Sequence, residues 1–446
     1  MAKQTNALHQ LGLITLTCLF AIPLFADSQV RIVRLSQVDG NVQIDRNTGQ
    51  SYEKAFLNLP ITEGMKIRTG HDGRVEVEFE DGSALRLTPN TEVDFPELRL
   101  RDAGGRLSTV VVKDGSAYLN FKNNRDDEFT LKFGREQVLL RKPVHLRVEV
   151  DDETAKLAVF SGDLMVDDPS GTFALEKRQT GTFDLAGEER STIAKDLEPS
   201  LYDDWDKQEN KYHDQYTAAN TYSPYGYGVS DLSYYGGYFS APGYGLCWQP
   251  YFVGLGWDPF MNGAWMWYPG FGYTWVSAYP WGWTPYRYGT WFFMPGRGWV
   301  WSPGNSWAGW NTMPRILNAP HGFVAPRPPA SPGQTVLVNR GPMPILVNNR
   351  RGLLIPNDSA ALGIQRGSLR NLPRISAQVQ QRGEIIEKAH STVMTTTPRA
   401  AGFGLSGVGP GGNPGSRMSA GGSAATSHSA SSHSAPAAHS SAAPHR

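Results

Sequence analysis

Apolar and polar residues alternate strictly over Val75–Glu80, which is the pattern of a strand with one buried face. Valine and phenylalanine side chains share one face of this segment, and three glutamates occupy the other. Asp81-Gly82 follows, and the alternation resumes over Leu85–Leu87. Because glycine adopts positive φ without steric cost, we predict a half-buried β-hairpin with its turn at Asp81-Gly82.

Similar patterns extend this β region over residues 27–195. Val144–Val150 is predicted as another half-buried strand, with His145 on its polar face. Lys156–Val159 and Asp163–Val166 flank Ser161-Gly162 and are predicted as a further hairpin. Turn-forming Asp-Gly pairs recur at Asp39, Asp72 and Asp114. Turn signals at this spacing predict a β-sandwich, a roll or a β-solenoid, and the region is long enough to bury a core without disulfides.

Several separated blocks in this region resemble the FecR-type extracytoplasmic domain. The blocks are Gly40–Val42, Leu59–Gly70, Asp72–Phe79, Asp81–Leu87, Val110–Gly115, Phe129–Phe133 and Val159–Gly162. In iron-uptake systems, members of this family relay a signal from an outer-membrane receptor to a sigma factor. Those regulators carry a cytoplasmic domain before a membrane helix, whereas only about ten residues precede the apolar stretch of this chain. The resemblance therefore implies a periplasmic or surface domain, with signalling as one of its expected roles.

A linker over residues 196–240 is predicted to contain a helix at 200–217. Ser200 and Asp203 have the spacing of a capping box, and aromatic residues recur on one helical face. That stripe comprises Leu201, Trp205, Tyr212 and Tyr216. We expect it to dock the helix between two modules.

The clearest internal repeat lies in residues 241–312, where a W-x-P-[FY]-x-x-G-x-W segment precedes a P-G-x-G-x-x-W segment. Trp257–Trp265 matches Trp283–Trp291, and Pro269–Trp275 matches Pro295–Trp301, at one common offset along the chain. Pro242–Trp248 is a third copy of the second segment. Aromatic strands separated by Pro-Gly turns predict short antiparallel hairpins, each covering its neighbour.

This region resembles a tryptophan-rich domain, described by Y-x-W-x-P-type repeats, that follows FecR-like domains in secreted bacterial proteins and has no established activity. All 13 tryptophans of the chain lie between residues 201 and 310. Two interpretations stay open: the rings form the core of a module without disulfides, or pairs on one strand face form a flat binding platform. The candidate contact residues for the second interpretation are Trp265, Trp267, Trp281, Trp283, Trp299 and Trp301.

The two ends of the chain differ from the rest in composition. Residues 11–25 are apolar and precede Ala26, so we predict a signal peptide over 1–26 and export to the periplasm or cell surface. Its removal leaves Cys247 as the one cysteine, and no apolar run that spans a membrane remains in the mature chain. Residues 313–446 are predicted to be a disordered tail, first rich in Pro and Arg and then in Gly, Ser, Ala and His. Short strands near 335–338 and 344–347, and a helix over 375–389, are alternatives within it.

Charge and motifs narrow the functional classes. The chain is neutral overall, but its front is mildly acidic and its tail is basic, which suits contact between the tail and an anionic surface. The tryptophan-rich region has few basic residues, so nucleic acid is not an expected partner. No spacing of catalytic, cofactor-binding or metal-ligating residues appears, so none is assigned and no cofactor is expected.

These patterns favour a mainly β, non-catalytic envelope protein that binds a glycan or a protein partner or serves as a scaffold. The alternative is a periplasmic signal-sensing protein related to FecR-type sigma regulators. An enzyme is the third and least favoured hypothesis.

Overall fold

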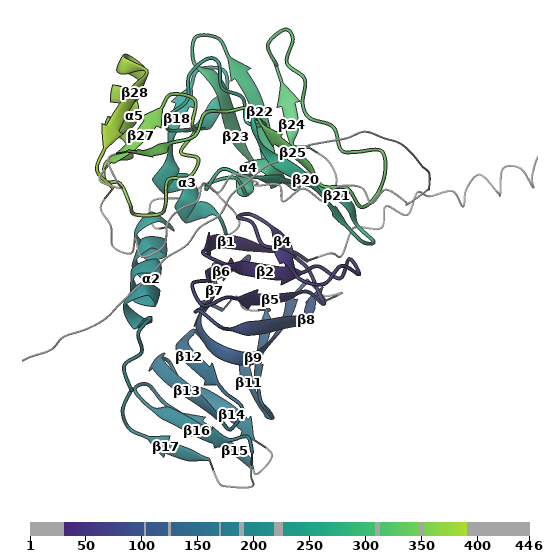
Figure 1. Cartoon of the computed structure of the whole chain (residues 1–446), viewed down its shortest axis with the longest axis vertical. Coiled ribbons are helices and arrows are strands. Elements are labelled where there is room, and N and C mark those ends of the chain that lie inside the picture. The colour runs from purple at the N-terminus through teal and green to yellow at the C-terminus, as the bar shows by residue number, and fades with distance from the viewer. Residues whose placement is uncertain are drawn as a thin grey trace, which may run out of the picture. The chain divides into compact units, whose positions relative to one another are not determined.

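The computed structural model describes residues 31–101, 104–123, 126–168, 171–186, 191–217, 226–307, 313–347 and 352–389. The predicted signal peptide, and residues 390–446 of the predicted tail, lie outside these ranges. The described chain is mainly β, as the alternation patterns predicted (Figure 1). No helix among the described residues is long and apolar enough to cross a membrane.

The first part of the chain, which we call the β domain, is a two-layered β structure whose strands form one continuous hydrogen-bonded system. One layer contains β2 (Val42–Asp45), β3 (Glu53–Lys54), β5 (Lys66–Thr69), β8 (Glu92–Leu100), β10 (Glu128–Phe133), β11 (Glu136–Leu140), β14 (Leu164–Asp168) and β15 (Gly171–Leu175). The other contains β1 (Val33–Asp39), β4 (Pro60–Ile61), β6 (Arg74–Glu78), β7 (Ala84–Leu87), β12 (Val144–Val150), β13 (Thr154–Ser161), β16 (Thr180–Asp184) and β17 (Thr192–Ala194). Apolar side chains from both layers pack into one core.

The hairpin predicted around Asp81-Gly82 is present. β6 and β7 pair antiparallel, with Val75 opposite Leu87 and Val77 opposite Leu85. Gly82 has a φ of 83°, which is the conformation that the turn required. The apolar face enters the core as expected, but the glutamate face is also buried, which the strict alternation did not predict.

Two predicted turns of the β domain are instead bends that carry the chain from one layer to the other. Asp114-Gly115 lies inside β9 (Arg106–Phe121), whose first half pairs with β8 and β10 and whose second half pairs with β7 and β12. Ser161-Gly162 connects β13 to β14, which lie in different layers and do not form the predicted hairpin. In both places the glycine has positive φ, so the same sequence signal produces a corner between layers.

Substituting Gly115 with alanine is expected to destabilise the β domain by more than about 2 kcal/mol, because a left-handed backbone alone costs a residue with a Cβ about 1–2 kcal/mol. Gly115 has a φ of 87°, and an added Cβ would lie 2.6 Å from Cα of Thr91. Gly243 is the matched control, since its φ is 77° but nothing lies within 4 Å of the added Cβ. Urea unfolding of both variants measures the difference, and equal losses would contradict the clash.

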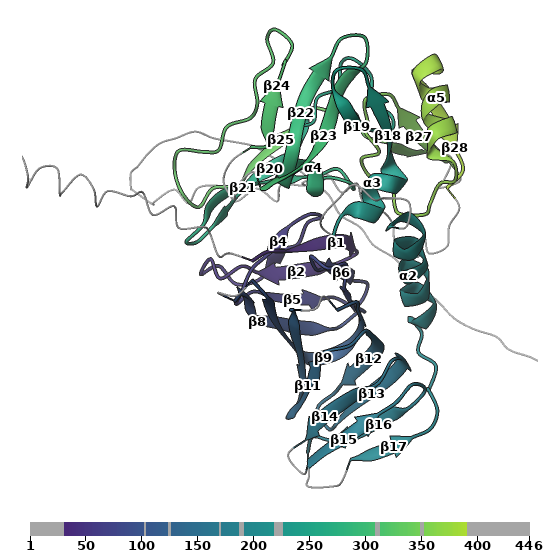
Figure 2. The same ribbon diagram turned by 180° about the vertical axis from the view of Figure 1, so that it is seen from behind.

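A helix follows the β domain at the place where the sequence predicted one. α2 (Asp203–Thr217) has Trp205 and Tyr212 buried, and Figure 2 shows it beside the layer that contains β6, β7 and β12. Leu201 precedes the helix and is 85% exposed, so it is not part of the docking stripe. The stripe instead includes His213 and two acidic residues, which pack against the glutamate face of β6.

The repeat is built from three successive hairpins, which we call the aromatic module. Their strands are β18 (Gly236–Ala241) with β19 (Gly245–Pro250), β20 (Asn262–Tyr268) with β21 (Gly272–Ser277), and β22 (Tyr288–Met294) with β23 (Gly298–Trp307). The short helices α3 (Val229–Tyr235) and α4 (Thr284–Arg287) precede the first and the third hairpin.

Each P-G-x-G segment is the turn of one hairpin. In the first copy, the amide of Tyr244 donates to the carbonyl of Ala241, so Pro242 and Gly243 are the central turn residues. Gly243 and its counterparts Gly270 and Gly296 have φ values of 77°, 79° and 75°. Proline before a glycine with positive φ is the preference of a type II turn, which explains why the motif repeats unchanged.

Part of the segment predicted as a disordered tail is ordered, so that prediction is wrong for the described residues between 313 and 389. Its elements are β24 (Arg315–Leu317), β25 (Val336–Asn339), β26 (Ile345–Val347), β27 (Gly352–Pro356), α5 (Leu372–Arg382) and β28 (Glu384–Glu387). β24 pairs with β22, and β25 pairs with β20. The overall composition misled because the apolar side chains of this segment are concentrated in residues 353–379, where Ile355, Ile375 and others pack into the core of the module.

Candidate functional site

Five of the six tryptophans predicted as candidate ligand contacts are buried. Their exposed fractions are at most 2%, and the residues are Trp265, Trp281, Trp283, Trp299 and Trp301. Trp267 is half-buried. A buried indole cannot stack on a sugar ring, so the predicted flat platform is wrong for these five, and the alternative interpretation of a tryptophan core describes them.

The buried indoles hold the module together by hydrogen bonds as well as by packing. Trp281 Nε1 donates to the carbonyl of Ala360 at 2.9 Å, and Trp301 Nε1 donates to that of Tyr288 at 2.9 Å. Trp248 Nε1 donates to the carbonyl of Leu232 at 2.9 Å. Each bond satisfies the one polar atom of a large apolar side chain and fixes a connecting segment. The function of these residues is therefore to build the module.

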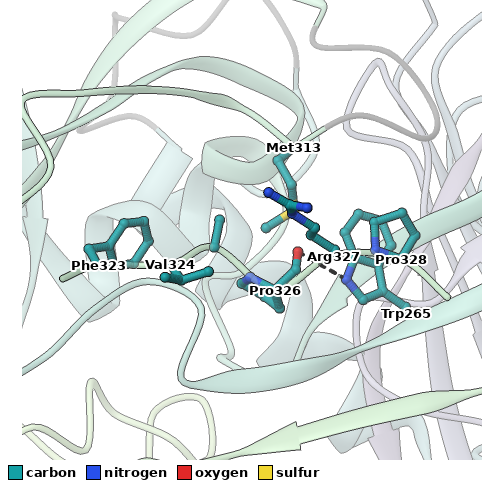
Figure 3. Close-up of a pocket in the computed structure, with 8 residues that line it drawn as sticks. Trp265, Met313, Phe323, Val324, Pro326, Arg327 and Pro328 are labelled. Atoms are coloured by element: carbon teal, nitrogen blue, oxygen red, sulfur yellow. Dashed lines mark hydrogen bonds between the residues drawn. The ribbon is translucent and has the colours of Figure 1, made fainter.

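Trp265 differs from the others because its ring reaches the edge of the module. Its Nε1 donates to the carbonyl of Pro326 at 3.3 Å, as the dashed line in Figure 3 shows. A shallow groove of about 450 Å³ lies here, lined by Trp265, Met313 and the segment Phe323–Pro328. The aromatic platform is thus replaced by a groove, one wall of which is a proline-rich segment of the same chain that covers the Trp265 ring.

A second candidate site is a group of buried charged side chains, which we call the charge cluster. It consists of Arg34, Glu76, Glu78, Arg86, Asp206, Glu209, His213, Asp231 and Arg366. These residues come from the β domain, from α2 and α3, and from the connection between β27 and α5. All have side chains that are at most 11% exposed.

Glu76 lies at the centre of the charge cluster. Its Oε1 accepts from Arg366 at 2.6 Å and lies 3.0 Å from His213 Nε2, while its Oε2 accepts from Arg86 Nε at 2.7 Å. Burial would raise the pKa of Glu76, but His213, Arg366 and Arg86 outweigh it and hold that pKa well below the usual value. The glutamate is therefore charged and fully paired in the folded protein.

Arg366 joins the part of the chain after the aromatic module to the β domain. Its Nε and NH2 donate to the two carboxylate oxygens of Asp231 at 2.9 Å and 3.0 Å, in addition to the bond with Glu76. Tyr212 also donates to Asp231, at 2.8 Å. This two-pronged geometry is the strongest form of an Arg–carboxylate pair. One side chain thus links α3, α2 and β6.

Arg34 and Asn58 make a parallel link from the β domain to the aromatic module. Arg34 NH2 lies 2.7 Å from Asp231 Oδ2 and donates to the carbonyl of Pro280 at 2.8 Å. Asn58 Nδ2 donates to the carbonyls of Ser277 and Tyr279 at 2.9 Å and 2.7 Å. Arg34 and Asn58 of the β domain therefore bond to backbone carbonyls of the module. Substituting side chains of the module would not remove these acceptors.

Two acidic groups of the charge cluster, Glu78 and Glu209, titrate differently from Glu76. At Asp206 and Asp231, by contrast, burial is outweighed by nearby cations and hydrogen bonds, which lower the pKa values of these groups as they do for Glu76. Burial raises the pKa of Glu78 and of Glu209, despite nearby cations. Burial would lower the pKa of His213, but Glu76 and Glu78 outweigh it and raise that pKa. Glu209 Oε2 has no hydrogen-bond partner in the described part of the chain. The cluster thus combines firmly charged groups with groups that favour protonation.

A groove of about 920 Å³ opens beside the charge cluster, between α2 and the strands β12 and β13. His145 and Phe160 line one side, and Asp203, Asp206 and Asn210 are among the residues on the other. His145 Nε2 lies 2.7 Å from Asp206 Oδ2. The acidic side of the groove would suit a basic partner, but the carboxylates of Asp203 and Asp206 are already engaged with Arg147, Arg86 and His145.

The sequence missed the charge cluster because its members are far apart in the chain. One signal was available: the β6–β7 register places Glu76 directly opposite Arg86, which predicts an ion pair across the hairpin. Nothing in the sequence connected that pair to His213, Asp231 or Arg366. Among the described residues, no group of three or more His, Cys, Asp or Glu could hold a metal ion.

Comparison with known families locates both modules. Residues 65–165, from β5 to β14, match the family model described as FecR protein, and residues 229–323, from α3 to the start of the groove segment, match a family of unknown function (DUF6600). The chain therefore contains a FecR segment followed by a tryptophan-rich domain of unknown function, as the two resemblances predicted.

Solved structures add a weaker similarity. Two crystal structures, at 1.65 Å and 2.50 Å, of a "putative anti-sigma factor" from Parabacteroides distasonis ATCC 8503 are 19% identical to the aligned part, with a TM-score of 0.26. The alignment covers 29% of this chain and 59% of that one. No curated protein matches the sequence.

Proposed function

We propose that the protein is a non-enzymatic regulator of the bacterial cell envelope, exported to the periplasm or the cell surface, whose FecR-type domain receives or transmits a signal. The match of residues 65–165 to the FecR family carries this proposal. Members of that family relay an envelope signal to a sigma factor, and the matched strands include β6 and β7 at the charge cluster.

The charge cluster supports a regulatory role because it makes the FecR strands depend on the rest of the chain. Glu76 on β6 is paired with Arg366, and Arg34 on β1 is paired with Asp231 of α3. Removing one partner of a buried ion pair leaves the other charge buried without a counter-ion. A change in α3 or near Arg366 therefore affects the strands of the β domain. A ligand or partner at the module would in this way alter the β domain.

The experiment is a chromosomal deletion followed by transcriptome measurement and complementation. We expect the deletion to change transcripts served by an extracytoplasmic sigma factor, and the wild-type gene to restore them. Arg366→Gln should restore them less well than Arg374→Gln, which alters an exposed arginine of α5. An unchanged transcriptome would refute the regulatory function. Immunoblots of membrane, periplasmic and culture fractions report the location and the amount of each variant.

A binding or scaffold role is the second candidate, and the groove at Trp265 is the observation that favours it. An envelope protein is a better candidate partner for this groove than a glycan, because the tryptophans that would form a flat sugar-binding platform are mostly buried. The net positive charge of residues 313–446 would add attraction to an anionic lipid or polysaccharide surface. Crosslinking in cells followed by fractionation would identify such a partner, and its failure to capture any would count against this role.

A further inference from the structure

The segment between β24 and β25 crosses the edge of the aromatic module without forming a strand or a helix. Within it, Phe323, Ala325, Pro326 and Pro329 are half-buried, whereas Val324, Arg327 and Ala330 are exposed. Phe323, Pro326 and Pro329 are spaced three residues apart. Three residues per turn is the repeat of the polyproline II helix, which proline-rich segments adopt because proline fixes φ and lacks an amide hydrogen.

Two side chains of the β20–β21 hairpin donate to the backbone carbonyls of this segment. Trp265 Nε1 donates to Pro326 at 3.3 Å, and Tyr273 Oη donates to Ser331 at 2.6 Å. The register places Trp265 opposite Trp275 and Tyr273 opposite Trp267, so both donors project from one face of the hairpin. A polyproline II backbone makes no internal hydrogen bonds, so its carbonyls are available to accept from donors of this kind.

The rest of the contact is aromatic and apolar. The ring of Phe323 lies 4.7 Å from that of Trp299 and 6.3 Å from that of Phe260. Figure 3 shows Met313, Pro326 and Arg327 gathered around the edge of Trp265. Tryptophan and tyrosine donors set in an aromatic surface are the features by which proline-rich peptides are recognised.

The occupying segment contributes little to the module beneath it. Val324 is 69% exposed, and besides the half-buried Pro326 and Pro329, Phe323 is the residue of 321–333 that packs against the aromatic core. Both ends are held independently, by the pairing of β24 with β22 and of β25 with β20. A tethered segment has a high effective concentration relative to a free peptide, so modest contacts suffice to keep it on the surface of Trp265 and Tyr273.

We propose that the aromatic surface around Trp265 and Tyr273, which we call the peptide groove and which residues 323–331 cover, is a recognition site for proline-rich, extended peptides, with those residues as its intramolecular occupant. The peptide that fits carries an aromatic residue followed by prolines at the third and sixth positions after it, as Phe323, Pro326 and Pro329 do. A partner with this chemistry would displace the segment when its local concentration exceeds that of the tether. The site goes beyond the regulatory role and does not depend on it.

The test replaces residues 321–333 with a Gly/Ser linker of equal length and measures binding of a fluorescein-labelled peptide with the sequence of those residues, by anisotropy. We expect the linker variant to bind the peptide at least about tenfold more tightly than the intact protein, whose groove is occupied by a tethered competitor. Trp265→Phe in the linker variant should weaken binding by about 2- to 10-fold, since a single hydrogen bond is lost. Trp205→Phe, which alters a buried tryptophan of α2 that does not line the groove and whose Nε1 makes no hydrogen bond within the described residues, is the matched control.

Three further measurements complete the test: an alanine-substituted peptide, a cleaved form of the protein, and peptidoglycan fragments as a second probe. A peptide in which the four prolines are replaced by alanine should not bind. If the linker variant does not fold, a protease site inserted after Pro332 frees one end of the segment in the folded protein, and the cleaved protein should then bind the peptide. A correctly folded linker variant or cleaved protein that fails to bind the peptide, or that binds peptidoglycan fragments instead, would overturn the proposal.

Discussion

Replacing Arg366 with methionine is expected to lower the free energy of unfolding by about 3–5 kcal/mol, the usual cost of removing one partner of a buried ion pair. The side chain is 7% exposed and bonds both Asp231 and Glu76. Methionine fills much of the volume but cannot donate, so two carboxylates lose a cation inside the protein. Guanidinium chloride unfolding, followed by circular dichroism, measures the loss.

Arg374→Met is the matched control for this substitution. Arg374 lies on α5 and is exposed, and no ion pair is recorded for it among the described residues. Its replacement should change stability by no more than about 0.5 kcal/mol, as is usual for surface positions. Equal effects of the two substitutions would mean that the charge cluster contributes no more than an exposed arginine does.

Trp281→Ala is expected to destabilise the aromatic module by about 3–5 kcal/mol, the range for truncating a buried tryptophan, and to lower the cooperativity of its unfolding. The Trp281 ring stacks on Tyr279 at 5.0 Å and lies within 6.0 Å of Trp257 and Trp291. Alanine would leave a large cavity and would also remove the indole hydrogen bond to the carbonyl of Ala360. Near-ultraviolet circular dichroism and thermal unfolding report the loss.

Trp267→Ala removes a similar ring from a less buried position. Trp267 is half-buried, and its recorded ring partner is Tyr273 at 5.1 Å. Its expected cost is smaller than that of Trp281→Ala by at least about 1 kcal/mol, because less area is lost from the interior. The core interpretation fails if the two variants unfold at the same denaturant concentration.

Local patterns predicted the elements that depend on nearby residues. The β6–β7 hairpin, the helix α2 and the Pro-Gly turns of the module were all visible in the sequence. Side-chain alternation indicates the hairpin, capping and helical periodicity indicate the helix, and residues that permit positive φ indicate the turns. The bends at Gly115 and Gly162 carried the same turn signal but change layers instead of reversing a hairpin. Whether such a turn closes a hairpin or carries the chain to the other layer depends on how the flanking strands pair, and the turn residues do not encode it.

The candidate site was predicted less well than the fold. Tryptophan spacing correctly indicated a shared strand face for Trp265 with Trp267 and for Trp299 with Trp301. It was wrong for Trp281 and Trp283, which lie outside the strands and pack into different cores, and the sequence does not state which face another segment covers. Residues 313–347 contact the module, and Ala360 accepts from Trp281, although the composition of the tail favoured disorder. Its apolar residues, such as Ile355, Leu362 and Ile375, order because the aromatic core supplies the surface against which they are buried.

The sequence by itself determined the β class, the order of the two family segments, the position of the helix and the period of the aromatic hairpins. Each follows from residue types within a short window, where alternation and turn chemistry act. Only the tertiary structure decided that Glu76 and Glu78 are buried with Arg34, Arg86 and Arg366, and that Trp265 contacts Pro326. These contacts join residues far apart in the chain, and the free energy of burying a charge or an indole depends on what the folded chain brings against it.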